Sequence, residues 1–146
     1  MKHLKENELN QFISVFVNTI SSVRGIFAEG YDKGGFFIPR IYCKDGFSIS
    51  IQVSPYSYCA SENGIRTYGM NWKLVEWGFP SQEIDGEKYN AEDCENTTGT
   101  VGAYVEISLI EELLDEHGGI DYQLTFSHQY ENDKKVFIPS IENLIK

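Results

Sequence analysis

The chain has 146 residues, enough for one domain, residues 1–146, with a sizeable buried core. Hydrophobic residues make up 41% and charged residues 23%, which excludes disorder of the whole chain, and the net charge of −10 with scattered basic residues disfavours nucleic-acid binding. No apolar run is long enough to cross a bilayer and the start, MKHLKENELNQF, lacks the apolar centre of a signal peptide, so we expect a cytoplasmic protein.

The first predicted element is an amphipathic helix that begins near residue 9. Its apolar residues recur at i, i+3, i+4, i+7, i+8 and i+11, a spacing that puts them on one face of a helix. These residues are Leu9, Phe12, Ile13, Phe16, Val17 and Ile20. Gly25 marks the region where the helix must have ended.

The period then changes to the alternation typical of strands. GIFAEGYD, residues 25–32, is a short candidate strand, and residues 34–55 read as a hairpin. Asp45-Gly46 predicts a two-residue turn. In the second arm Phe47, Ile49, Ile51 and Val53 alternate with polar residues, so one face is predicted to be buried. Pro39 cannot donate to a ladder, which predicts an edge strand or a bulge in the first arm.

The second half is predicted to contain strands, a polar loop and a helix. MNWKLV, residues 70–75, alternates as a strand does, and 81–100 reads as a surface loop with little to bury. VGAYVEI, residues 101–107, is a candidate strand. SLIEELLDEH, residues 108–117, predicts a helix, with Ser108 and Glu111 as a capping box and Gly118-Gly119 as its stop. IDYQLTF, residues 120–126, and KKVFIP, residues 134–139, are short strand candidates.

This order of elements predicts an α+β fold. We expect an antiparallel β-sheet of about five or six strands, with the N-terminal helix and the helix near 108–117 packed on it. Short connections favour antiparallel pairing. Neither an internal repeat nor a low-complexity linker divides the chain.

The sequence predicts no catalytic residue, metal site or cofactor. His3, His117 and His128 are far apart and fit no zinc pattern, and the glycines lack the spacing of a phosphate-binding loop. His117 precedes Gly118, where a cationic imidazole would suit the C-terminus of a helix. The three cysteines are widely spaced and are interpreted as reduced thiols. A second hypothesis keeps a small enzyme or ligand-binding domain open, with Cys59 and His128 in its site.

The negative charge is concentrated in about a quarter of the chain. From Glu83 to Glu116 there are 11 acidic residues and one basic residue, Lys88, whereas the rest has 11 of each. The plain interpretation is a solvated loop and helix face. The sharper one is a docking face for a basic protein, since charge of one sign accelerates association and carboxylates can stand in for phosphates.

Exposed aromatic residues beside such a face would supply contact area. The predicted partner-binding residues are Glu83, Asp85, Glu87, Glu92, Asp93, Glu95, Glu111, Glu112, Asp115, Glu116, Tyr89 and Trp77, with Tyr104 as a further aromatic.

Two segments, VEWGFPSQE (75–83) and LIEELLDEHGGID (109–121), resemble parts of small accessory proteins from bacteriophages and prophages. The resemblance implies a host-directed role such as blocking a bacterial defence nuclease, as anti-CRISPR proteins do. The resulting hypothesis is a small, acidic, non-enzymatic inhibitor of a basic, nucleic-acid-handling protein. A toxin-immunity protein that neutralises a basic toxin fits the same physics.

Overall fold

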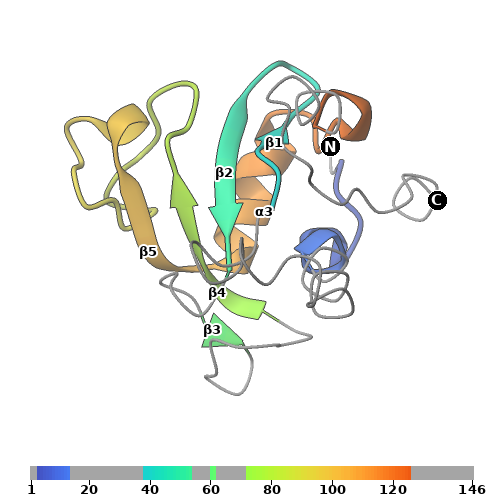
Figure 1. Ribbon diagram of the computed structural model, residues 1–146, viewed down its shortest axis with the longest axis horizontal. Coiled ribbons are helices and arrows are strands. Elements are labelled where there is room, and N and C mark those ends of the chain that lie inside the picture. The colour runs from blue at the N-terminus through green and yellow to red at the C-terminus, as the bar shows by residue number, and fades with distance from the viewer. Residues whose placement is uncertain (1–2, 14–37, 54–59, 62–71, 126–146) are drawn as a thin grey trace, which may run out of the picture.

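The computed structural model describes residues 3–13, 38–53, 60–61 and 72–125 (Figure 1). In chain order these form β1 (Ile41–Tyr42), β2 (Ser48–Gln52), β3 (Ala60–Ser61), β4 (Trp72–Gly78), the 3-10 helix η1 (Thr97–Gly99), β5 (Val101–Glu106) and α3 (Ile107–Glu116). Residues 8–13 and 122–125 are also helical. The α+β prediction is therefore confirmed. The candidate strands at 25–32 and 134–139 lie outside the described residues.

Strand β4 is the centre of an antiparallel sheet. Leu74 pairs with β3 and with β5, and Trp77 pairs with Ile51 of β2 and Gly102 of β5. Strands β2 and β3 therefore follow one another along one edge of β4, while β5 takes the other edge. With β1 paired to β2, the five strand segments make a sheet four strands wide, narrower than the predicted five or six strands.

The core lies between the sheet and the helices. The alternation predicted for β2 is confirmed, because Phe47, Ile49, Ile51 and Val53 are all buried. Helix α3 lies behind β2 in Figure 1 and buries Ile110, Leu113 and Leu114. The N-terminal helix, predicted from its apolar stripe, buries Leu9, Phe12 and Ile13. Each element thus contributes one apolar face to a single core.

An amide side chain fastens the N-terminal helix to the sheet. Asn10 accepts a hydrogen bond from the backbone N–H of Trp72 at 2.7 Å and donates one to its carbonyl at 3.1 Å. The two bonds satisfy backbone groups at the first residue of β4, where the strand ladder begins. Asn10 is not one of the apolar residues whose spacing predicted the helix, and nothing in the sequence indicated this contact.

The turn between β1 and β2 has three residues instead of the predicted two. Cys43 N–H donates to the Phe47 carbonyl at 2.7 Å, which encloses residues 44–46. Gly46 has φ +96°, a conformation that glycine adopts without strain. Strand β1 forms the sheet edge, as Pro39 predicted, but begins only at Ile41.

The predicted C-terminus of α3 is confirmed, whereas the predicted N-terminal cap is wrong. Strand β5 runs directly into the helix at Ile107, so Ser108 already lies in the first turn and cannot act as its cap; no side-chain capping bond is present. The glycine stop is confirmed. Gly118 N–H donates to the Asp115 carbonyl at 3.1 Å and Gly119 N–H to that of Leu114 at 2.9 Å, with both glycines at positive φ, which is a Schellman motif.

The strand predicted for 120–126 is wrong. Asp121 accepts a hydrogen bond from Leu124 N–H at 2.9 Å and so caps a helix at 122–125. Ile120 alone makes a bridge, to Cys43. Within the described part of the chain, none of the helices has the length and apolarity to span a bilayer.

Gly102 is the position where the sheet depends most on the lack of a side chain. A methyl group there would lie 2.1 Å from Nε1 of Trp77. We expect Gly102→Ala to lower the free energy of unfolding by at least about 2 kcal/mol, measured by urea denaturation, because the fully buried indole has no room to move. The same substitution in a Trp77→Leu background should be milder by about 1 kcal/mol or more. Equal effects in both backgrounds would contradict the packing account.

Candidate interaction surface

The acidic loop, residues 79–100, covers the outer edge of β5. Glu92 N–H donates to the Val101 carbonyl at 2.9 Å, and Ala91 forms an antiparallel bridge with Gly102. The side-chain amide of Asn90 donates to the Ala103 carbonyl at 2.7 Å. The loop therefore takes the place of a neighbouring strand, which satisfies backbone groups that an open edge would expose to other chains.

Some acidic side chains hold the loop in shape. The carboxylate of Glu83 accepts hydrogen bonds from the N–H groups of Thr98 at 2.9 Å and Thr97 at 3.0 Å, the first residues of η1. These two bonds, Thr98 first, lower the pKa of Glu83. Asp85 accepts from Lys88 N–H at 3.2 Å and Asp93 from Glu95 N–H at 3.0 Å, so both stabilise local turns.

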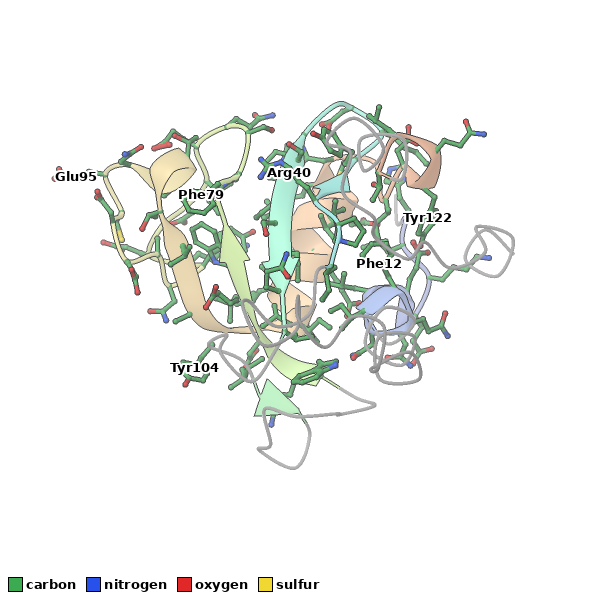
Figure 2. All side chains as sticks on the ribbon, viewed as in Figure 1. Phe12, Arg40, Phe79, Glu95, Tyr104 and Tyr122 are labelled. Carbon is green, nitrogen blue, oxygen red and sulfur yellow. The ribbon has the colours of Figure 1, made fainter. Side chains whose placement is uncertain are left out.

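All six predicted acids of the loop are exposed. They are Glu83, Asp85, Glu87, Glu92, Asp93 and Glu95. Figure 2 shows Glu95 pointing outward at the edge of the molecule. The loop is therefore a well-ordered segment that presents carboxylates to solvent.

Lys88 connects this loop to α3. Its ammonium lies 3.0 Å from a carboxylate oxygen of Glu112 and 5.4 Å from the ring centre of Tyr89. Burial raises the pKa of Tyr89, and the negative charges of Glu116 and Glu112 raise it further while Lys88 opposes them. Glu112 and Glu116, both exposed and one helical turn apart, therefore adjoin the loop at this point.

The other two acids of α3, Glu111 and Asp115, are less exposed than Glu112 and Glu116. Both are half-buried. Asp115 accepts hydrogen bonds from the backbone N–H groups of Leu4, at 2.8 Å, and His3. These contacts, Leu4 first, lower its pKa. Asp115 thus fastens the N-terminal segment to α3.

The expectation that Trp77 and Tyr89 are exposed is wrong, since their exposed fractions are 0% and 3%. Trp77 points inward from β4, and its Nε1 donates to the Tyr89 carbonyl at 2.8 Å. Tyr89 packs against the core from the loop side. The exposed large apolar residues among those described are Phe79, at 52%, and Tyr104, at 41%. The exposure of Tyr104 was predicted. The exposure of Phe79 was not predicted, because Phe79 follows the last residue of β4, where the alternation of a strand no longer indicates which face a side chain takes.

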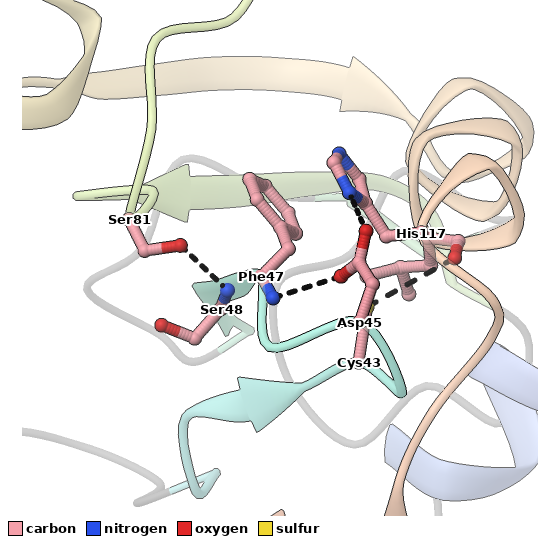
Figure 3. Close-up of polar contacts among 7 residues, drawn as sticks. Cys43, Asp45, Phe47, Ser48, Ser81 and His117 are labelled. Atoms are coloured by element: carbon pink, nitrogen blue, oxygen red, sulfur yellow. Dashed lines mark hydrogen bonds and ion pairs between the residues drawn. The ribbon is translucent and has the colours of Figure 1, made fainter.

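A histidine–aspartate pair at the end of α3 is the nearest thing to catalytic geometry (Figure 3). His117 Nδ1 lies 2.6 Å from Asp45 Oδ2, and the imidazole stacks on the Phe47 ring with the ring centres 4.0 Å apart. Although partial burial raises it, the pKa of Asp45 is lowered by the Phe47 N–H and by His117. The adjacent Cys43 is unsuited as a nucleophile, because burial raises the pKa of its thiol to about 12.

The same pair has a structural task. Asp45 N–H donates to the His117 carbonyl at 3.3 Å, and Lys44 N–H to that of Gly119 at 3.2 Å, so the β1–β2 turn is attached to the C-terminus of α3. His117 lies at that terminus, as predicted. Cys59 and His128, the residues of the enzyme hypothesis, lie outside the described residues. In the described ranges no three His, Cys, Asp or Glu side chains form a group suited to a metal ion.

Comparisons with protein-family models, with curated proteins and with solved structures find no match to this chain. The chemistry of its surface is therefore the basis for a proposal about function.

The loop geometry can be tested through Glu83. Its pKa is lowered on folding, so its stabilising effect is present above the ordinary glutamate pKa, about 4.3, and is lost as the pH falls through the lower folded value. In an NMR titration we expect the amide proton shifts of Thr97 and Thr98 to change with a midpoint below about 4.3. Glu83→Gln should abolish this titration, whereas Glu87→Gln should leave it in place. A midpoint at or above the ordinary value would contradict the two hydrogen bonds.

Proposed function

We propose that the protein is a small, non-enzymatic inhibitor that acts in the cytoplasm by binding a basic, nucleic-acid-handling protein. Its docking surface is the anionic surface, defined as the exposed acids Asp85, Glu87, Glu92, Asp93 and Glu95 of the loop with Glu112 and Glu116 of α3. These carboxylates take the place of the phosphates that the partner otherwise binds.

The observation that supports the proposal is that the acidic loop is ordered by its own hydrogen bonds. A loop that only solvates a charged segment has no need of a fixed shape. Here the side chain of Glu83 accepts a hydrogen bond from η1, that of Asn90 donates one to β5, and that of Lys88 donates one to α3. Because the loop is already ordered, binding would require little further loss of conformational entropy.

Electrostatics gives this arrangement its specificity for a basic partner. Carboxylates gathered on one side of a molecule accelerate encounter with a cationic surface, and the effect weakens as salt screens it. Lys88 is the one basic residue of the sequence between Glu83 and Glu116, and it forms an ion pair with Glu112. The two cysteines in the described residues, buried Cys43 and exposed Cys94, are free thiols, which suits the reducing cytoplasm.

Charge reversal tests the proposal. The triple variant Glu87→Lys, Glu92→Lys, Glu95→Lys avoids Glu83, Asp85 and Asp93, whose carboxylates shape the loop. The probe is a basic protein retained by the parent from nuclease-treated host lysate and then purified. Its affinity for the variant should be at least about tenfold weaker near 50 mM salt, with a smaller difference near 500 mM, by calorimetry.

A matched pair of single substitutions provides the control. Glu95→Lys and Glu6→Lys change the net charge equally, and both residues are exposed. Glu6 belongs to the N-terminal segment, which lies across the sheet from the acidic loop in Figure 1. Only Glu95→Lys should weaken binding. Equal effects of the two substitutions would mean that net charge matters and not the anionic surface. If the parent protein retains no basic protein from the lysate, that result would contradict the proposed function itself.

A further inference from the structure

Phe79 is an exposed aromatic residue in a backbone conformation that phenylalanine rarely adopts. Its φ is +51°, in the left-handed region, and its side chain is 52% exposed. A bulky residue in this region is strained, and the following Pro80 restricts the backbone further. A glycine would adopt the same conformation without strain, so the backbone of the turn does not by itself explain a phenylalanine here.

The surrounding structure holds Phe79 in this conformation from several sides. Its N–H donates to the Thr100 carbonyl at 2.9 Å, and its carbonyl accepts a hydrogen bond from Nη2 of Arg40. Nε of Arg40 also donates to the Ser48 hydroxyl at 2.9 Å, which fixes the guanidinium on β2. Ser81, two residues on, donates from its N–H to the Ser48 carbonyl at 2.8 Å. Its hydroxyl accepts a hydrogen bond from Ser48 N–H at 2.9 Å (Figure 3).

The result is a ring that projects from a fixed point at the start of the acidic loop. In Figure 2 Phe79 lies toward the same end of the sheet as Glu95, whereas Tyr104 lies at the other end of β5. Strained residues persist where their surroundings determine them fully, and they concentrate at functional sites. Aromatic side chains, phenylalanine among them, are enriched at the cores of interfaces, and a ring held on a rigid base loses little conformational entropy on binding.

We propose that Phe79 is the apolar anchor of the docking surface and inserts into an apolar recess, rimmed by Lys or Arg, on the basic partner. This inference rests on the proposed function, which it extends from charge to a specific contact. Charge complementarity indicates this kind of partner, because the carboxylates of the anionic surface would lie over the basic rim while the Phe79 ring fills the recess. Arg40 is a positioning residue that holds the carbonyl of Phe79.

A matched pair of glycine substitutions tests the anchor. Phe79 and Tyr104 both have φ +51° and both are exposed, so glycine fits either backbone and removes only the ring. Against the purified basic partner, Phe79→Gly should weaken binding about 30-fold or more, and Tyr104→Gly less than about threefold. The loss at Phe79 should persist near 500 mM salt, since an apolar contact is not screened. Phe79→Tyr should retain most of the affinity.

Each outcome separates this inference from the proposed function. Near-parental binding by Phe79→Gly, together with weak binding by the triple charge reversal, would overturn the anchor and leave the proposed function standing. A Phe79→Gly protein that runs as a monomer where the parent runs as a dimer would also overturn it, because the recess would then belong to a second copy. If the glycine variant unfolds, Phe79→Asn repeats the test, because asparagine also tolerates the left-handed region. Failure of the parent to retain any basic protein removes both proposals.

Discussion

The contact between the Trp77 indole and the backbone of Gly102 is the constraint on which the acidic half of the molecule depends. The indole lies against β5 where a side chain would collide with it, and its Nε1 reaches past the strand to the Tyr89 carbonyl. One buried side chain thereby joins the central strand, the edge strand and the loop beyond it. Since the loop also pairs with β5 through Ala91, a fault at this contact would release the loop and the edge together.

This anchoring separates the acidic residues into two groups with different tasks. Glu83, Asp85 and Asp93 accept backbone hydrogen bonds and give the loop its shape. The remaining exposed acids are displayed by that shape. Negative charge in the first group is compensated by oriented N–H groups, which accounts for the lowered pKa of Glu83. Asp85 and Asp93 nevertheless remain exposed, so a cationic partner would meet their charge together with that of the second group.

Helix α3 distributes its acids by its own period. Glu112 and Glu116 are four residues apart and lie on the side that adjoins the loop, while Asp115 reaches the N-terminal segment. The rotation of the helix is set at both ends: β5 leads into it directly, and the Schellman motif with the Asp45–His117 pair holds its C-terminus. The acidic quarter of the sequence therefore becomes a surface of loop and helix that leaves out the half-buried Glu111 and Asp115.

What the sequence by itself determined was local. The alternation in β2, the apolar stripe of the N-terminal helix, the glycine stop after α3 and the polarity of the loop follow from the period of side chains and from residues that suit one backbone conformation. Tertiary structure decided the remainder. It buried Trp77 and Tyr89, and it left Phe79 exposed. It also made residues 122–125 a helix that Asp121 caps. These outcomes could not be predicted from the sequence because they depend on strand pairing and on contacts between residues distant in the chain.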